Sequence, residues 1–377
     1  MVDFRINSYG TMMYALRCEM KSYKAGIIGC GSIANAHAKG YKTLGIEITA
    51  AADISQEQLA LFQKNYGIQN LYTDYKVMLE KEDLDIVSIC TWPPLHAEMT
   101  INSARSGVRG ILCEKPMAMN LAEADAMIEA CDEQGVKLAI GHMRRFSEPY
   151  AEARKVILSG AIGEVYFIHG VTVGDLLSDG THIIDMIRFY AGDVPVNWVV
   201  GQVDARGKRT RYGHYIEDSS ISYFEFENGV RAFLEIGLPY GKQQSNFVQA
   251  GSSVLLPQST MWWRKGAKYT TVYVHGSEGR IDVGERESPR LRYKGKGDID
   301  WKIPQLKGAI DPFAMQIGAL IESIEKNTEH PCSGQQGRAA LEIIMAVHES
   351  ARRRAKVFLP LSVKGYPLAE MIEKGEI

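Results

Sequence analysis

The sequence predicts an α/β protein: a doubly wound parallel sheet, followed by an α+β domain with a large, mostly antiparallel open sheet. Short apolar runs alternate with helical segments up to about residue 143, as expected of buried parallel strands. Longer strands with alternating side chains follow, as in a sheet that is covered on one face. A chain of 377 residues is long enough for two such domains. We therefore expect domains over residues 20–143 and 144–377, preceded by an extension outside the core, residues 1–19.

The first predicted strand begins at Lys24 and leads into the glycine turn Gly29-Cys30-Gly31, with Ala34 three residues further on. Two glycines at this spacing let a strand turn tightly into a helix while the backbone stays bare enough to touch a pyrophosphate. Gly29 would make the turn, and Gly31 would admit the phosphates. The residues of this turn that we expect at a dinucleotide are Gly29, Gly31, Ser32 and Ile33. Without its context, the motif would be an ordinary tight turn.

The second predicted strand, residues 46–52, ends in Asp53. An acidic side chain about 20 residues after the glycine turn is placed to bind the adenosine ribose. A carboxylate accepts hydrogen bonds from both ribose hydroxyls but repels a 2′-phosphate, and no arginine follows Asp53 closely. The sequence therefore favours NAD over NADP. The alternative is a solvated carboxylate at the end of a strand.

Three more apolar runs and one capped helix complete the first domain. The helix begins at Asn120, whose capping box closes with Glu123, and it ends at Gly135. The apolar runs, each of a length typical of a buried strand, are residues 86–90, 110–113 and 137–140.

The second domain opens with a helix over about residues 149–159. Two later strands are joined by Glu227-Asn228-Gly229, in which Asn-Gly is a strong hairpin signal. Near the end of the chain, Asp311-Pro312 opens one helix, and Ser333 opens another with Gln336 closing its capping box. The alternating strands are residues 164–168, 219–226 and 230–236.

Composition argues against several classes of function. The formal net charge of −2 argues against a general nucleic-acid binder, and we expect the basic run at residues 206–211 to be a solvated loop. No apolar stretch approaches the roughly 20 residues that span a bilayer. The six cysteines show neither a C-x-x-C pair nor the spacing of zinc ligands, so no metal is expected. Free thiols indicate a reducing, cytoplasmic setting.

Ligands of a doubly wound sheet bind beyond the carboxyl ends of its strands. Residues 91–96 follow the fourth apolar strand, and Glu114-Lys115-Pro116 follows the fifth. A lysine between a carboxylate and a proline has a fixed backbone, and here it would face the nicotinamide side of the crevice. Taken alone, the same segment would be an exposed Glu-Lys pair in a loop.

Seven motifs together resemble one known family, and the match extends over nearly everything after Met20. They are, in order, the glycine turn, Thr91 to His96, Glu114-Lys115-Pro116, Arg145-Phe146, Gly180-x-His182-x-x-Asp185, a late strand segment at residues 276–280, and Val357-Phe358-Leu359-Pro360-Leu361. The chain is similar to the glucose–fructose oxidoreductase / inositol dehydrogenase (Gfo/Idh/MocA) family. The resemblance implies a Rossmann domain, a second domain whose open sheet forms oligomer contacts, and a nicotinamide-dependent alcohol–ketone conversion on a sugar or cyclitol.

The resemblance also implies that Lys115 and His182 lie beside the reacting carbon. A histidine with a pKa near neutrality suits the acceptor of the hydroxyl proton, and Lys115 would stabilise the developing alkoxide. Trp92 and Pro94 stand where the family often has proline and asparagine. The cofactor contacts implied outside the glycine turn and Asp53 are Thr91, Trp92, His96, Glu114 and Lys115.

Alternatives stay open for three of the implied residues. The family commonly has an aspartate four residues before the histidine, where this chain has Ser178. Asp179 would orient His182, contact a substrate hydroxyl or only cap the helix. Arg145 would reach the substrate or form a structural ion pair, and His182 itself would be structural on the plainer interpretation. The implied catalytic residues are Lys115, His182 and Asp179, and the implied substrate contacts add Arg145. The remaining histidines are expected to be structural.

The leading hypothesis is an NAD-dependent dehydrogenase of a sugar, polyol or cyclitol. One alternative is a lyase or hydrolase that oxidises a sugar carbon transiently and shows no net redox change. Another is a non-catalytic sensor of a sugar or dinucleotide, although a sensor has no need of a proton acceptor. A homodimer or homotetramer through the second sheet is expected, without a nucleic-acid or membrane partner.

Overall fold

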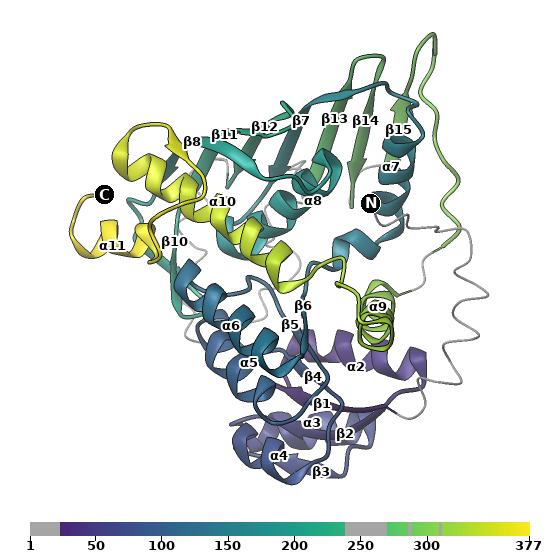
Figure 1. Ribbon diagram of the computed structural model, residues 1–377, viewed down its shortest axis with the longest axis vertical. Coiled ribbons are helices and arrows are strands. Elements are labelled where there is room, and N and C mark those ends of the chain that lie inside the picture. Colours follow the sequence, from purple (N-terminus) through teal and green to yellow (C-terminus); the bar gives the residue numbers. More distant parts are fainter. Residues whose placement is uncertain (1–22, 238–269, 286–288, 309–310) are drawn as a thin grey trace.

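Figure 1 shows the fold as a computed structural model, which describes residues 23–237, 270–285, 289–308 and 311–377. The expected extension, residues 1–19, lies outside these residues. The chain forms two parts, each built on one sheet, with the first part at the bottom of the view and the second at the top. Among the described helices, none is both long and apolar enough to cross a membrane.

The first sheet has six parallel strands in the described part of the chain, in the order β3-β2-β1-β4-β5-β6. Every residue of β4 and β5 is buried, which explains why these strands appear in the sequence as short continuous apolar runs. The expected strands are confirmed, with ends that shift by one residue at most. The six strands are β1 (Lys24–Ile28), β2 (Glu47–Ala52), β3 (Asn70–Tyr72), β4 (Ile86–Ile89), β5 (Gly110–Cys113) and β6 (Lys137–Ile140).

Helices connect these strands, and the expected helix α6 starts and ends where its sequence signals predict. The Asn120 side chain accepts a hydrogen bond from the N–H of Glu123 at the start of α6. Gly135 ends the same helix in the left-handed conformation that favours glycine. The connecting helices are α2 (Ser32–Leu44), α3 (Gln56–Tyr66), α4 (Tyr75–Lys81), the short 3₁₀ helix η2 (Pro93–Leu95), α5 (His96–Ala104) and α6 (Leu121–Gln134).

The strand order creates a crevice at the centre of the first sheet. Strand β1 lies between β2 and β4, so the chain runs from β1 toward one edge and from β4 toward the other. Ligands of such sheets bind at the carboxyl ends of the two strands where this direction reverses. The segments that begin at Gly29, after β1, and at Cys90, after β4, therefore border the candidate site.

The second sheet has eight strands within the described residues, in the order β15-β14-β13-β7-β12-β11-β8-β16. All neighbouring pairs are antiparallel except β7 with β12, so the expected mostly antiparallel sheet is confirmed. Its strands are β7 (Val165–Thr172), β8 (Val196–Asp204), β11 (Ser219–Phe226), β12 (Arg231–Ile236), β13 (Thr271–Gly276), β14 (Gly279–Gly284), β15 (Leu291–Lys294) and β16 (Val357–Phe358). A separate hairpin pairs β9 (Arg209–Arg211) with β10 (His214–Ile216).

Helices α8 and α10 pack against this sheet on the same face (Figure 1). The close approach of α8 requires Gly170 on β7, because a Cβ there would lie 2.5 Å from Ile183 and 2.9 Å from Ile187. Ser333 caps α10 through the N–H of Gln336, as expected. The remaining helices are η3 (Met143–Phe146, 3₁₀), α7 (Glu148–Leu158), the π-turn η4 (Leu176–Gly180), α8 (Thr181–Ala191), α9 (Pro312–Lys326), α10 (Gly334–Arg353) and α11 (Pro367–Glu373).

Two tight turns of the second sheet test the turn signals of the sequence. Asn228-Gly229 joins the antiparallel strands β11 and β12, so the hairpin prediction is confirmed. Residues 276–280, expected as a strand segment, instead contain the turn between β13 and β14. A Cβ at Gly276 would lie 2.1 Å from the carbonyl oxygen of Ile162, so the backbone comes too close for any side chain.

Helix α9 belongs to the second half of the chain but packs on the first part, beside α2 (Figure 1). A Cβ at Gly40 of α2 would lie 3.0 Å from the backbone nitrogen of Ala314, and one at Gly110 of β5 would lie 2.7 Å from Ile324. Asp311 caps α9 by accepting from the N–H of Phe313. The core of the first sheet therefore includes a helix from beyond residue 143.

Candidate active site

The glycine turn after β1 has the geometry that the sequence predicts. Gly29 has a φ of +89°, and a Cβ on it would lie 2.9 Å from the carbonyl atoms of Cys90. Only glycine therefore lets the turn approach the end of β4. A Cβ on Gly31 would meet nothing within 4 Å, and the first turn of α2 carries no acidic side chain. The N–H groups of Ser32 and Ile33 thus open a helix N-terminus that suits an anion.

The Asp53 carboxylate is fixed beside this turn. One oxygen accepts a 2.7 Å hydrogen bond from the N–H of Cys30, and the other accepts a 2.8 Å bond from the N–H of Ser55. Each carboxylate oxygen can accept further bonds, so ribose hydroxyls can still be bound. No lysine, arginine or histidine of the described residues forms an ion pair with Asp53. This arrangement fits the two ribose hydroxyls of NAD.

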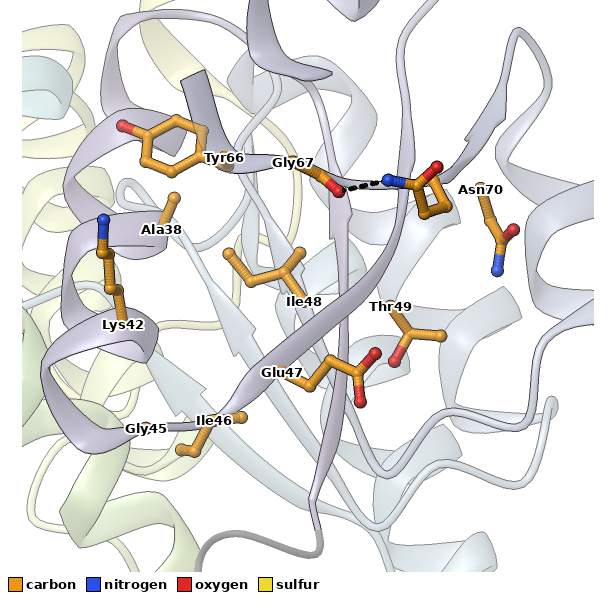
Figure 2. A pocket seen from close by; sticks show the side chains of 11 residues that line it. Ala38, Lys42, Gly45, Ile46, Glu47, Ile48, Thr49, Tyr66, Gly67 and Asn70 are labelled. Atoms are coloured by element: carbon orange, nitrogen blue, oxygen red, sulfur yellow. Dashed lines mark hydrogen bonds between the residues drawn. The ribbon is translucent and has the colours of Figure 1, made fainter. Parts of the chain in front are cut away.

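A hollow of about 640 Å³ opens at the other end of β2 and is shown in Figure 2. Lys42 and Tyr66 lie on one side of it, and the side chains of Glu47 and Thr49 lie on the other. It is lined by the start of β2, whereas Asp53 follows the end of that strand. This hollow is therefore separate from the crevice at the carboxyl ends of the strands.

The segments after β4 and β5 are joined by a buried histidine. The two ring nitrogens of His96 lie 2.9 Å from the Pro116 carbonyl oxygen and 3.1 Å from that of Thr91. Burial lowers the pKa of His96, so its ring is neutral and donates to one of the two carbonyls. His96 thus fixes the loops that carry Thr91 and Lys115, and Trp92 beside it is 57% exposed.

Glu114 is also buried and fixes the same region. Its carboxylate accepts a 3.2 Å bond from the N–H of Lys115 and lies 2.9 Å from His37 Nε2. Burial alone would raise the pKa of Glu114, but the hydrogen bond from His37 and the nearby positive charges outweigh it and lower the pKa. The other ring nitrogen of His37 lies 3.0 Å from the Ser88 hydroxyl, so this buried network ties α2 to β4 and β5.

The π-turn η4 meets Lys115 from the opposite side of the site. Lys115 Nζ donates a 2.7 Å hydrogen bond to the carbonyl oxygen of Ser178. Asp175 caps the turn by accepting from the N–H of Ser178, and the buried Glu217 carboxylate accepts from the N–H of Leu176. A π-turn is rare and is frequent at functional sites. Here it brings a backbone carbonyl to the lysine that follows β5.

His182 lies in the first turn of α8 and is 8% exposed. Its Nδ1 has no hydrogen-bond partner among the described residues, and the same is true of the buried hydroxyl of Ser178. Burial, followed by the charges of Arg144 and Lys115, lowers the pKa of His182 well below its ordinary value. The ring is therefore neutral at physiological pH and has a free lone pair, but its lowered pKa makes it a weaker base than the near-neutral histidine that the sequence suggested.

Asp179 does not cap α8, because the N-cap position of that helix is Gly180 and no side chain caps it; Asp175 caps the preceding π-turn. The Asp179 carboxylate instead accepts a 2.7 Å bond from Arg211 Nη1, and the same nitrogen lies 3.0 Å from Asp175. Arg211 belongs to the basic run that the sequence suggested as a solvated loop. That expectation is wrong for β9, where Arg209 pairs with Asp218 and Arg211 with the two carboxylates of the π-turn.

Arg145 is the center of a buried ion-pair cluster. Its five N–H groups bond to the carboxylates of Asp185 and Asp193 and to the carbonyl oxygen of Pro331. Although burial opposes its charge, the two carboxylates raise the pKa of Arg145 well above its usual value. The structure thus corresponds to the ion-pair alternative, and no donor of Arg145 is left for a substrate hydroxyl.

Comparison with known proteins identifies the family. The family model described as an oxidoreductase family with an NAD-binding Rossmann fold matches residues 23–142, and the model of its C-terminal α/β domain matches residues 168–359. The chain belongs to the Gfo/Idh/MocA family. Its first domain is the NAD-binding Rossmann domain of that family, and the chain is an oxidoreductase by this membership.

Relatives of this Gfo/Idh/MocA chain cover nearly its whole length. The D-apiose dehydrogenase of Paraburkholderia graminis is 27% identical over an alignment of 367 positions that covers 90% of each chain. The myo-inositol 2-dehydrogenase of Thermotoga maritima is 23% identical over 89% of this chain and 98% of that protein. A levoglucosan dehydrogenase solved with NADH and levoglucosan has a TM-score of 0.75 at 20% identity, over 90% of this chain and 100% of that chain. The structural likeness shows a shared fold.

Several residues of this Gfo/Idh/MocA site were not singled out from the sequence. Arg145 was singled out from the sequence, but it is the neighbouring Arg144 whose charge helps to lower the pKa of His182. His142 was taken as structural, but its Nε2 lies 2.9 Å from the Thr181 hydroxyl and its ring centroid lies 6.1 Å from that of His182. Both residues follow β6, so the rule that ligands bind at the carboxyl ends of strands could have found them. No comparable signal pointed to Arg211.

Proposed function

We propose that this protein is an NAD-dependent oxidoreductase that converts a secondary alcohol of a sugar, polyol or cyclitol to a ketone. The observation that carries the proposal is the 2.7 Å bond between Lys115 Nζ and the Ser178 carbonyl. It brings the lysine of the Rossmann domain against the turn that leads into His182. Relatives that are named as dehydrogenases of D-apiose and myo-inositol support a polyhydroxylated substrate.

The residues that would hold NAD lie at the carboxyl ends of β1, β2, β4 and β5. The backbone of Gly31, Ser32 and Ile33 would face the pyrophosphate, and Asp53 would bind the adenosine ribose. Thr91 and Trp92 would border the cofactor after β4. His96 and Glu114 would support the site by fixing the loops that follow β4 and β5. Because a carboxylate repels a 2′-phosphate, we propose NAD rather than NADP. Bound NAD supplies the hydride acceptor.

His182 is the proposed proton acceptor. During oxidation, the hydroxyl proton of the substrate moves to the neutral imidazole while the hydride leaves the same carbon, and a C=O bond forms. The lowered pKa of His182 keeps the ring unprotonated before this step. In the direction of reduction, the same ring returns the proton to the oxygen.

Lys115 and Asp179 are the proposed partners of His182. The Lys115 ammonium has three N–H donors, of which one bonds to Ser178, so the others can bond to the reacting oxygen and stabilise its negative charge. One oxygen of Asp179 accepts from Arg211, and we assign the other oxygen to a substrate hydroxyl. The buried hydroxyl of Ser178 and Nδ1 of His182 are further sites where substrate hydroxyls would bond.

A homodimer or homotetramer through the second sheet is part of the proposal. Helices α8 and α10 cover one face of that sheet (Figure 1), and apolar and aromatic side chains that are exposed or half-buried lie on the strands away from these helices. Contiguous apolar side chains at a surface mark association sites. Those on these strands include Trp198, Val200, Ile221, Tyr223, Phe233 and Tyr273. Light scattering of the wild type and of Ile221→Glu tests it: the variant should have a smaller mass, and a monomeric wild type would contradict it.

A panel of sugars and cyclitols tests the proposed reaction. Myo-inositol, D-apiose, levoglucosan, common aldoses and the disaccharides cellobiose, maltose and lactose are incubated with NAD or NADP, and the absorbance of the reduced cofactor is followed. We expect reduction of NAD with at least one compound and a product that mass spectrometry shows to be lighter by two hydrogens. Tight NAD binding by calorimetry without reduction by any compound would contradict a dehydrogenase. A product altered by elimination, without net reduced cofactor, would contradict net oxidation.

A further inference from the structure

The tip of the β9–β10 hairpin has an unusual composition for its backbone. Arg211 pairs with His214, which leaves Tyr212 and Gly213 as a two-residue loop. Their φ angles are +49° and +81°, so both residues are left-handed, as in a type I′ turn. Such a turn favours asparagine followed by glycine, and a bulky residue at its first position is strained. The tyrosine at the tip is therefore unfavourable for the hairpin itself.

Burial does not offset this strain. Tyr212 is 45% exposed. Its described ring neighbours are Trp92, with centroids 6.3 Å apart, and the guanidinium of Arg211, 4.9 Å from the ring centroid. Trp92 is itself 57% exposed, so two large aromatic rings present open surface side by side. Strained residues are maintained where function uses them, and an exposed aromatic pair suits contact with a ligand.

The aromatic pair lies at the rim of the proposed active site. Arg211 precedes Tyr212 and bonds to Asp179 of the π-turn. Trp92 follows Thr91, whose carbonyl oxygen contacts the ring of His96. The same ring contacts the carbonyl oxygen of Pro116, so this loop is joined to the Lys115-Pro116 segment. The hairpin also approaches the first domain directly, because a Cβ on Gly213 would lie 3.5 Å from Pro94. The pair thus spans the two domains next to the proposed catalytic residues.

We propose that Trp92 and Tyr212 form an aromatic platform for a second ring of the substrate, which is therefore a disaccharide or a glycoside rather than a free monosaccharide. The inference rests on the proposed function and names its substrate class. The C–H face of a sugar ring packs on an aromatic ring, and pockets for such ligands are lined by aromatic side chains. The guanidinium beside the platform is already paired with the carboxylates of Asp175 and Asp179, so it offers no free positive charge to an acidic ring and the platform suits an uncharged one.

Matched sugar pairs test the platform in the NAD-bound enzyme. Kinetic constants are measured for D-glucose with cellobiose and maltose, and for D-galactose with lactose. For at least one pair, kcat/KM of the disaccharide should exceed that of its monosaccharide. At saturating NAD, which removes any effect of Trp92 on cofactor affinity, Tyr212→Asn and Trp92→Ala should each lower this ratio about tenfold, through KM of the disaccharide. Tyr212→Phe keeps the ring and should keep the ratio.

Stability gives a second, independent result. Asparagine suits the left-handed position, so Tyr212→Asn should raise Tm by roughly 1–3 °C while the disaccharide preference falls. A ratio that Tyr212→Asn and Trp92→Ala leave unchanged would overturn the platform but not the dehydrogenase. Turnover of monosaccharides alone would also overturn the platform. A Trp92→Ala variant that weakens only NAD binding would do the same. If no sugar is oxidised, the proposed function fails; the platform is then tested by quenching of tryptophan fluorescence with cellobiose, and no quenching overturns it.

Discussion

At the scale of single residues, some buried polar atoms of the site have hydrogen-bond partners in the protein, and others have none among the described residues. All five donors of Arg145 are bonded to protein, whereas Nδ1 of His182 and the hydroxyl of Ser178 are buried without a partner among the described residues. An unsatisfied buried polar atom destabilises a fold by about 1–3 kcal/mol. Such atoms are expected where a ligand completes their hydrogen bonds, and these two are four residues apart, one in the π-turn η4 and one in the first turn of α8.

Removing the proposed acid–base residues should abolish most turnover without unfolding the protein. His182→Ala and Lys115→Ala should each lower kcat by about 10²- to 10⁴-fold and leave NAD affinity nearly unchanged. Because both act on one oxygen, the double variant should lose much less than the product of the single losses. Stopped-flow kinetics and calorimetry with NAD measure the two effects. A His182→Ala enzyme that keeps most of its turnover would place the proton acceptor elsewhere.

Asp53→Ser should shift the cofactor preference. Loss of the carboxylate removes charge-assisted bonds to the ribose, so NAD binding should weaken about 10- to 100-fold. NADP binding should improve, because the like charge that repels the 2′-phosphate is gone. Calorimetry with both cofactors measures the change. The serine hydroxyl is one bond shorter than the carboxylate oxygen that accepts from the N–H of Cys30, so circular dichroism serves as the control for folding. Equal NAD and NADP affinities in the wild type would refute this argument.

At the scale of elements, the π-turn η4 carries the site and is held by the buried carboxylates of Asp175 and Glu217. Asp175 is fully buried, caps the turn through the N–H of Ser178 and pairs with Arg211. Asp175→Ala should lower the free energy of unfolding by about 2–4 kcal/mol, since both the cap and the buried pair are lost. Asp175→Asn keeps an acceptor for the cap and should lose less. Urea denaturation measures both variants, and equal losses would show that the cap contributes little.

Local signals in the sequence predicted these elements better than they predicted the contacts between them. The caps at Asn120, Ser333 and Asp311 depend on neighbours within three residues, so they could be read from sequence. The pairing of Arg211 with the π-turn joins residues 32 or more positions apart, and nothing local marks it. The cap at Asp175 was missed because a π-turn, rather than an α-helix, begins there.

At the scale of the whole molecule, the candidate site is assembled by docking of the two sheets. Lys115 and Asp53 come from the first part, while His182 and Asp179 come from the second. The family resemblance allowed Lys115 and His182 to be placed together, because their motifs occur in a fixed order. The return of α9 onto α2 could not be predicted, since a helix with one apolar face packs equally well on either sheet. That helix strengthens the attachment between the parts.

Buried neutral histidines make the whole fold sensitive to acid. Burial lowers the pKa of His142 and of His330 to about 4, and it also lowers the pKa of His182 and His96. The unfolded chain binds these protons near pH 6.5, whereas the folded chain binds them only near its lowered pKa values. The free energy of unfolding is therefore unaffected by these groups above pH 6.5, and it falls progressively as the pH is lowered toward 4.

The expected result is a lower urea midpoint at pH 5 than at pH 7. His142 and His330 should each account for about 1–2 kcal/mol of the loss, and the other two histidines should add to it. His142→Gln serves as the matched control. Its amide occupies the position of Nε2 and can still bond to the Thr181 hydroxyl but does not titrate, so the dependence on pH should be shallower in this variant. A midpoint that is the same at pH 7 and pH 5 would mean that water reaches these rings and protonates them in the folded protein.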